Sequence, residues 1–222
     1  MTPASGKPGR NCPRCPRLVA FRQTWRAKEP KWFNAPVDSF GPPDARLLIV
    51  GLAPGLRGAN RTGRPFTGDF AGELLYATLK QFGFAQGHYE ARADDGMKLI
   101  DCRITNAVRC VPPDNKPTTT EIATCRDFLS ATVGEMQKLR AIVTLGRIAH
   151  ETVVAALQAN RRDYPFVHGG AYAIGAIGLF SSYHCSRYNT ATGVLTPAMF
   201  RKVFAQVRRH LDAVEAATPP PG

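Results

Sequence analysis

The sequence predicts an α/β fold: a three-layer α/β/α sandwich around a central parallel sheet of four strands. Four short apolar runs have the length of buried strands, and they occupy residues 46–51, 103–108, 141–146 and 177–184. Helical patterns separate or follow these runs, at residues 69–82, 118–139, 147–158 and 197–215. Strands that alternate with helices form parallel sheets that are covered on both faces.

Two of these helices also carry end signals. The helix at 69–82 stops before Gly83, a residue type that ends helices because it tolerates the left-handed conformation. The helix at 118–139 has Thr118 and Glu121 at the spacing of a capping box. A chain of 222 residues fits a single domain, here expected over residues 12–216. Its Pro- and Gly-rich ends predict a flexible arm at 1–11 and a flexible tail at 217–222.

The charge of the chain indicates a polyanionic partner. Its 222 residues include 29 Lys and Arg against 17 Asp and Glu, which gives a net charge of +12. Such an excess favours nucleic acid first and an anionic membrane second. The chain has no apolar stretch long enough for a membrane span and no apolar core of a signal peptide at its start. We therefore expect a cytoplasmic, nucleoid-associated monomer with no membrane partner.

Three polar loops are expected to meet at one edge of the sheet. In parallel sheets, ligands bind beyond the carboxyl ends of the strands. The glycine-rich and basic segment 51–69 follows the first strand, "NAVRCVPPDNKP" (106–117) the second, and "YHCSRYNTATG" (183–193) the last. The first segment matches neither of the two common phosphate-binding glycine motifs. The convergence of the three loops predicts a binding or catalytic site.

Four of the six cysteines form two pairs. Cys12 and Cys15 are a C-x2-C pair, and Cys110 and Cys125 are the second pair. Thiols of a cytoplasmic protein stay reduced, so a disulfide framework is not expected. Four thiolates are enough for a tetrahedral zinc ion or for an iron–sulfur cluster, and the spacing leaves both open. The alternative is that Cys125 only packs on an apolar helix face.

Three separated motifs and the order of the cysteines resemble a known family. "GLAPG…GANRTGRPFTGD", "ITNAVRCVPPDNKP" and "SYHCSRYNTATGVLT" are similar to segments of the family 5 (B-type) uracil-DNA glycosylases of bacteria and archaea. The resemblance covers nearly the whole chain and implies a three-layer fold with a [4Fe–4S] cluster. It also implies base-excision repair: hydrolysis of the N-glycosidic bond of uracil in DNA, and often of hypoxanthine and other damaged bases, to leave an abasic site.

The resemblance assigns roles to individual residues. It makes Cys12, Cys15, Cys110 and Cys125 the cluster ligands. It makes Gly51, Leu52 and Ala53 the backbone of a pocket for water and base. In it Phe66 stacks on the flipped base, Asn106 reads the edge of that base, and His184 faces its O2 atom. Each of the last three also has a structural reading, as a core aromatic, a turn asparagine and a satisfied strand-end histidine.

The first motif does not supply the catalytic carboxylate. Related families place a polar or acidic side chain in the first motif, and "GLAPG" has none. Asp69 is the nearest carboxylate, and we expect it, with Asn106 and His184, to form the catalytic group. The alternative is that Asp69 is only the N-cap of the helix that follows, a role that aspartate often takes.

Basic and polar side chains of the same loops are expected to bind DNA. The phosphate contacts expected are Arg57, Arg61, Arg64, Lys116 and Arg187. Ser186 and Asn189 complete the expected DNA-binding set, and Arg187 and Tyr188 are candidates to fill the space that a flipped base leaves. Two rival interpretations stay open: a non-catalytic, zinc-stapled nucleic-acid-binding module, and a hydrolase that holds a nucleotide phosphate in the first loop.

Overall fold

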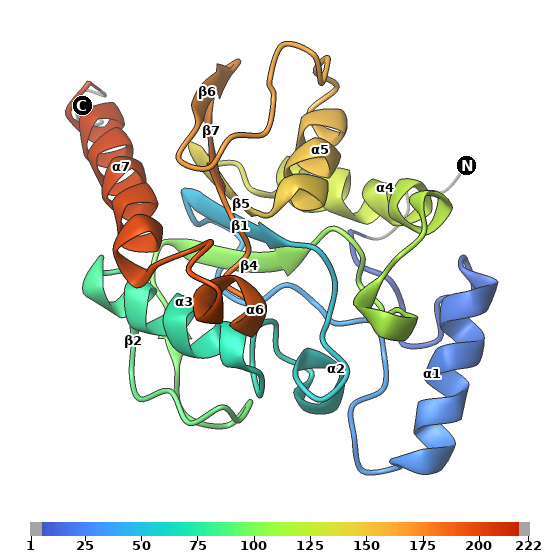
Figure 1. The fold of residues 1–222 in the computed structure, drawn as a ribbon. Helices are drawn as coiled ribbons and strands as arrows, with labels where there is room; N and C mark the ends of the chain where they lie inside the picture. Colours follow the sequence, from blue (N-terminus) through green and yellow to red (C-terminus); the bar gives the residue numbers. More distant parts are fainter. Residues whose placement is uncertain (1–5, 218–222) are drawn as a thin grey trace.

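The computed structural model describes residues 6–217, and its centre is a five-stranded sheet with the order β4-β1-β5-β7-β6. The first four strands are mutually parallel (Figure 1). They are β4 (Cys102–Asn106), β1 (Leu47–Gly51), β5 (Ala141–Leu145) and β7 (Ile177–Ser182). The edge strand β6 (Ala171–Ile174) pairs with β7 in the antiparallel direction. The four parallel strands are the four that the sequence predicts.

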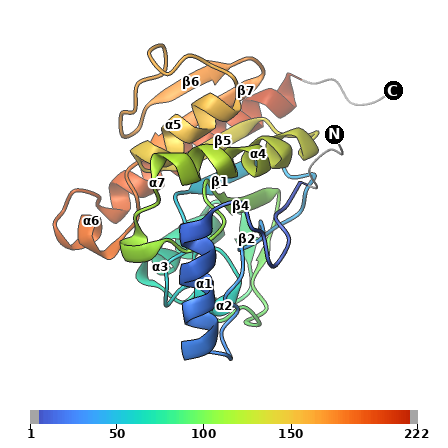
Figure 2. The same cartoon turned by 90° about the vertical axis from the view of Figure 1, so that its right-hand side faces the viewer.

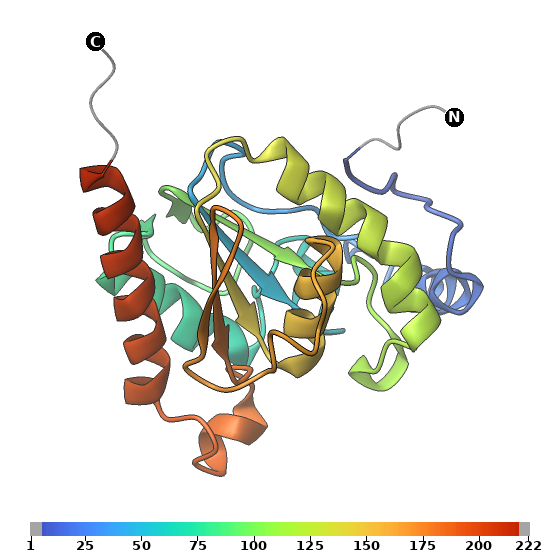
Figure 3. The same ribbon diagram turned by 90° about the horizontal axis from the view of Figure 1, so that it is seen from above.

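Alternate residues of the strands pack against helices on opposite faces of the sheet. On one face, Leu47 and Ile49 share an apolar core with α3 (Phe70–Gln81) and α7 (Pro197–Ala216). On the other face, Leu48 packs in a core with α4 (Thr119–Glu135) and α5 (Arg147–Ala156). Seen from above, the sheet lies between these two helix layers (Figure 3). The predicted three-layer α/β/α sandwich is therefore confirmed, with one antiparallel strand added at its edge.

The remaining elements lie outside this sandwich. Helix α1 (Pro16–Lys28) projects beside it (Figure 2) and packs Leu18 against Phe128 of α4. The short elements are α2 (Ala59–Thr62), β2 (Ala85–Gln86), β3 (Lys98–Leu99), a 3-10 turn (Pro113–Asn115) and α6 (Arg187–Ala191). None of these was predicted, because they are short or, in α1, because the apolar side chains do not form one buried face: only Leu18 and Arg22 are buried.

The ends of the chain are described only in part. Residues 1–5 and 218–222 of the expected arm and tail lie outside the described residues. Arg10 and Asn11, also placed in the arm, accept hydrogen bonds from the Arg26 guanidinium of α1. The domain limits remain a prediction. Within residues 6–217, no helix has the length and apolar character needed to cross a membrane.

Candidate active site

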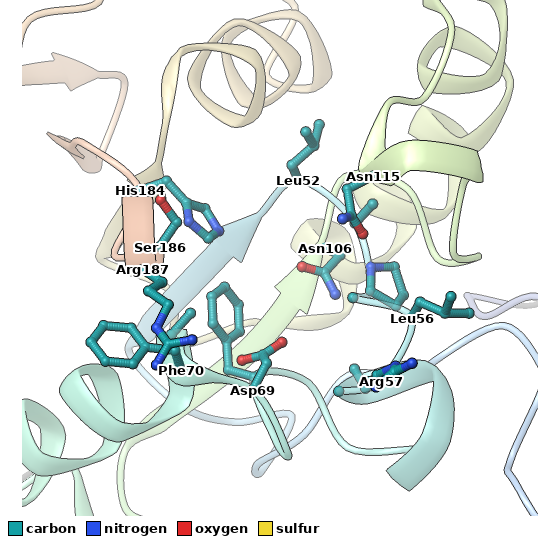
Figure 4. A pocket seen from close by; sticks show the side chains of 17 residues that line it. Leu52, Leu56, Arg57, Asp69, Phe70, Asn106, Asn115, His184, Ser186 and Arg187 are labelled. Carbon is teal, nitrogen blue, oxygen red and sulfur yellow. The ribbon is translucent and has the colours of Figure 1, made fainter. Parts of the chain in front are cut away.

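The three polar loops meet around one pocket at the carboxyl edge of the sheet. The pocket encloses about 640 Å³, which lies in the range of small-molecule sites. From the three loops it takes Leu52, Asp69 and Phe70, then Asn106 and Asn115, and then His184, Ser186 and Arg187 (Figure 4). The convergence that the sequence predicts is thus present.

Gly51 allows two side chains to close over the end of β1. It pairs with Asn106 in the register of β1 and β4. A Cβ atom at residue 51 would lie 2.5 Å from Asn106 Oδ1 and 2.6 Å from the Phe66 ring. Only glycine leaves room for both groups. Asn106 is buried, and its Oδ1 has no hydrogen-bond partner among the described residues, although a buried oxygen of this kind is normally satisfied.

Phe66 and His184 form an aromatic wall of the pocket. Their rings are stacked, with centroids 5.9 Å apart and an interplanar angle of 27°. Phe66 is 6% exposed and has a backbone φ of 52°, which is uncommon for a residue with a bulky side chain. The ring therefore lies in the pocket wall, at a strained position of the loop.

His184 is held by the loop that follows β7. Its carbonyl oxygen accepts a hydrogen bond of 2.8 Å from Asn189 Nδ2. Burial lowers the pKa of His184 to about 4. The imidazole is therefore neutral near pH 7, and a neutral imidazole can donate one hydrogen bond from its single N–H.

Asp69 occupies the N-cap position of α3, but its side chain makes no capping hydrogen bond. Its Oδ1 is buried without a hydrogen-bond partner among the described residues. Its Oδ2 lies near Gly55 and Gly58. Burial raises the pKa of Asp69, and the amides of Gly72 and Ala71 oppose this shift. The carboxylate thus faces the pocket (Figure 4), which is the orientation that a catalytic role requires.

Most of the basic residues expected to bind DNA are exposed around this pocket. Arg57 and Arg187 line it, and the Arg187 guanidinium lies 5.8 Å from the Phe70 ring centroid. Arg61 and Lys116 are exposed nearby in the chain. Arg57, Arg61, Lys116 and Arg187 are therefore all exposed, two of them at the pocket itself.

Arg64 lies inside the protein, although the sequence predicts that it binds DNA. Its side chain is 5% exposed and makes two hydrogen bonds of 2.7 Å to the buried carboxylate of Asp95. Its guanidinium also lies 5.2 Å from the Phe40 ring centroid and 5.4 Å from that of Tyr76. The prediction that Arg64 contacts phosphate is wrong, because the side chain is buried in an ion pair inside the protein.

Of the expected DNA-binding residues at α6, Ser186 and Asn189 make hydrogen bonds inside the loop, whereas Tyr188 is exposed. Ser186 Oγ accepts a hydrogen bond from the Asn189 amide and so caps α6. The Asn189 side chain donates to the His184 carbonyl. Ser186 and Asn189 therefore both stabilise the conformation of the loop that carries His184. Tyr188 is 73% exposed, so its ring is free to meet a partner.

Phe70 and Asn115 line the pocket although the sequence analysis did not single them out. Asp114 and Asn115 have φ values of 54° and 56°, and two left-handed non-glycine residues in succession are unusual. The "PDN" sequence is a turn signal that favours such a conformation, but it does not show that the turn reaches the pocket.

The four paired cysteines line a second, smaller pocket between α1 and α4. Cys12, Cys15, Cys110 and Cys125 surround it, together with the apolar side chains Leu18, Val108 and Phe128. Burial raises the pKa of Cys110 to about 12 and that of Cys125 to about 11. In residues 6–217, no three His, Cys, Asp or Glu side chains converge closely enough to hold one metal ion.

The surroundings of these thiols are basic. Arg14, Arg22 and Arg109 line the same pocket, whose lining within residues 6–217 includes no carboxylate. Arg22 is buried and its Nη1 lies 3.6 Å from Cys110 Sγ, while the Arg109 amide donates to Cys125 Sγ at 3.3 Å. The Arg109 guanidinium is also buried and, among the described residues, donates to the hydroxyls of Ser39 and Thr132.

The three-layer fold and the pocket with Phe66, Asn106 and His184 at the edge of its sheet agree with a family assignment. The model of the uracil DNA glycosylase superfamily matches residues 39–208. The chain belongs to this superfamily and to its type-5 family.

Three relatives support this assignment, each named a type-5 uracil-DNA glycosylase. The protein from Thermus thermophilus is 43% identical, with 89% of this chain and 93% of the relative aligned. That from Mycobacterium bovis is 40% identical, over 89% and 77% of the two chains. That from Pyrobaculum aerophilum is 38% identical, over 84% and 83%.

Proposed function

We propose that this protein is a monofunctional uracil-DNA glycosylase, which hydrolyses the N-glycosidic bond of uracil in DNA and leaves an abasic site for base-excision repair. One observation supports this most: Phe66, Asp69, Asn106 and His184 surround a single pocket in a chain of the type-5 family. The superfamily model and the names of the relatives support the same reaction.

The pocket suits a flipped pyrimidine. An enzyme that acts on a base in duplex DNA extrudes the nucleotide and binds the base by stacking and by hydrogen bonds to its edge. Phe66 offers a flat apolar face. Asn106 can accept from uracil N3–H through Oδ1 and donate to O4 through Nδ2. Cytosine would present the opposite donor and acceptor pattern, which leaves buried polar groups unpaired and disfavours its binding.

The hydrolysis uses a carboxylate and an imidazole. Water attacks C1′ of the sugar, so a C–O bond forms as the C1′–N1 bond breaks. Asp69 orients this water and takes up its proton, and a raised pKa suits a base of this kind. The electron pair of the broken bond goes to the base, where neutral His184 donates a hydrogen bond to the developing charge on O2.

The exposed basic side chains bind the DNA backbone. Arg57, Arg61, Lys116 and Arg187 contact phosphates and give affinity without sequence selectivity. Tyr188, which is strongly exposed on α6, fills the gap that the flipped base leaves, next to Arg187.

The four cysteines bind a [4Fe–4S] cluster. Such a cluster takes four thiolates, each on its own iron, and so does not need them to meet at one point, as a zinc ion does. The four thiols share one pocket, which is what a common cluster needs. Arg22 and Arg109 fit it as well, because buried positive charge stabilises a negatively charged thiolate cluster. When bound, the cluster ties the segment of Cys12 and Cys15 to β4 and α4.

Two measurements test these proposals. Purified protein is incubated with a duplex that contains uracil and then treated with alkali, which cleaves abasic sites. No strand scission with uracil, nor with a hypoxanthine duplex, would contradict glycosylase activity. Broad visible absorption with about four irons per chain supports the cluster, whereas a colourless protein with stoichiometric zinc supports the zinc-stapled binding module. The monomeric state and the nucleoid location remain predictions.

A further inference from the structure

The backbone at Phe66 is in the left-handed conformation, with a φ of 52°. A left-handed conformation at a bulky residue costs free energy and persists only where neighbouring groups hold it. Phe66 adopts this conformation at the point where its ring enters the pocket wall. The structure must therefore contain groups that hold residues 65–67 in place.

Three side chains donate hydrogen bonds to the three successive carbonyl oxygens of this segment. Tyr76 Oη donates to Pro65 O at 2.8 Å, and Tyr89 Oη donates to Phe66 O at 3.2 Å. Thr62 Oγ1 has three carbonyl oxygens within reach of its single proton, and Thr67 O is the nearest at 3.0 Å. Of the three donors, only Tyr89 bonds the strained residue itself.

Tyr89 is held in turn by a buried ion pair. The Tyr89 ring is stacked on the Tyr76 ring, with centroids 4.7 Å apart. The Arg64 guanidinium lies 6.0 Å from the Tyr89 ring centroid. Asp95, which pairs with Arg64, also accepts hydrogen bonds from the Glu90 and Met97 amides. The pair therefore fixes the segment that follows Tyr89, and this is the internal task of Arg64.

Gly72 lies against the hydrogen bond between the Tyr89 hydroxyl and the Phe66 carbonyl. It lies in the first turn of α3, where glycine lowers helix stability relative to alanine. A Cβ atom at residue 72 would lie 2.0 Å from Phe66 O and 2.2 Å from Tyr89 Oη. Glycine is thus required at residue 72 for the Tyr89 hydroxyl to reach the Phe66 carbonyl.

We propose that Tyr89 is a positioning residue for base excision: its hydroxyl, fixed by the Arg64–Asp95 pair, holds Phe66 in the conformation that presents its ring to the base. This inference rests on the proposed stacking role of Phe66. Tyr89 does not touch the base, and it acts through the Phe66 backbone.

Tyr89→Phe tests the proposal, because it removes one hydroxyl and keeps the ring. The single-turnover rate of uracil excision should fall about five- to tenfold, the effect of one lost hydrogen bond. Inhibition by free uracil should weaken by a similar factor, while affinity for undamaged duplex stays unchanged. Tyr172→Phe is the matched control, since it removes a tyrosine hydroxyl that donates to Pro165 O in another part of the fold. An unchanged rate and uracil inhibition in Tyr89→Phe would overturn the proposal.

A double-mutant cycle with Phe66→Leu separates positioning from a general loss of stability. If Tyr89 acts through Phe66, adding Tyr89→Phe to Phe66→Leu causes no further loss. Multiplying effects would show an independent role and overturn the proposal. An unchanged rate in Phe66→Leu alone would refute the stacking role and this inference with it, while excision by the wild-type protein would still support the proposed function.

Gly72→Ala tests the same contact from the side of α3. It favours the helix intrinsically but forces the Tyr89 hydroxyl and the Phe66 carbonyl apart. Excision and uracil inhibition should weaken at least as much as in Tyr89→Phe. Wild-type values for this variant would overturn the proposal, because they would show that the close contact is not needed.

Discussion

The carboxylate of Asp69 lies against Gly58, so closely that a Cβ atom at residue 58 would be 2.4 Å from Oδ2. The glycine-rich loop after β1 thus lets backbone approach a side chain from the far end of the same loop. Asp69 makes no capping hydrogen bond to α3, although the nearby amides of Gly72 and Ala71 partly offset the rise in its pKa. The contact holds the carboxylate at the pocket, and Oδ1 is buried there without a hydrogen-bond partner among the described residues.

Asp69→Asn should lower the single-turnover excision rate by about 10²- to 10⁴-fold, the usual contribution of a general base. Asparagine keeps the shape of the side chain but cannot accept the proton. Binding to undamaged duplex and the melting temperature should change little, because the side chain does not cap α3. A variant with the wild-type rate would show that Asp69 has no catalytic role.

The pH dependence of excision should have one acidic limb, and it should belong to Asp69. The pKa of Asp69 is raised above its usual 3.8, so the basic form is lost as the pH falls through this raised value. His184 stays neutral down to about pH 4 and adds no step near its usual 6.5. The measurement is kcat/KM between pH 4 and 8, with controls for folding. A step near pH 6.5 that disappears in His184→Gln would contradict this assignment.

His184 should also make the protein less stable in acid. Its folded pKa lies below its unfolded value, so between about pH 6.5 and 4 the unfolded chain binds a proton that the folded chain does not. Unfolding is therefore favoured as the pH falls through this range. Denaturant titrations at several pH values should show a smaller loss of stability on acidification in His184→Gln than in the wild type. Equal slopes would show that the imidazole titrates normally in the folded protein.

The sequence allowed much of the fold and site to be predicted, for local reasons. The runs that form β1 and β5 are almost entirely apolar because both faces of these strands are buried, whereas β4 and β7 also contain polar residues. Strand β6 was missed because its residues alternate between exposed and partly covered. The orientation of Asp69 and the burial of Arg64 were not predictable, since both depend on residues distant in the chain or on backbone contacts: Gly58 for one and Asp95 for the other.

Arg57 and Arg64 should behave in opposite ways when each is replaced by glutamine. Arg57 is exposed at the pocket, so its loss should reduce the salt dependence of DNA binding by about 0.9 in the slope of log K against log salt. Arg64→Gln should keep that slope and lose about 3–5 kcal/mol of stability, because it leaves the Asp95 carboxylate buried without its partner. Fluorescence anisotropy at several salt concentrations and denaturant titration measure the two effects. A reduced salt slope in Arg64→Gln would restore it as a phosphate contact.

Cys110→Ser and Cys102→Ala should separate the cluster from ordinary packing. Both cysteines belong to or follow β4, but Cys110 lines the small pocket, whereas Cys102 packs among apolar residues under α3 and α7. Cys110→Ser should lose most of its iron and its visible absorption, while Cys102→Ala should keep both. Loss of the cluster should also weaken DNA binding, because the tethered helix α1 carries Arg17, which holds the Lys116 carbonyl and pairs with Glu121. Iron analysis, absorption spectra and duplex affinity test these outcomes, and a Cys110→Ser protein with wild-type iron would exclude Cys110 as a ligand.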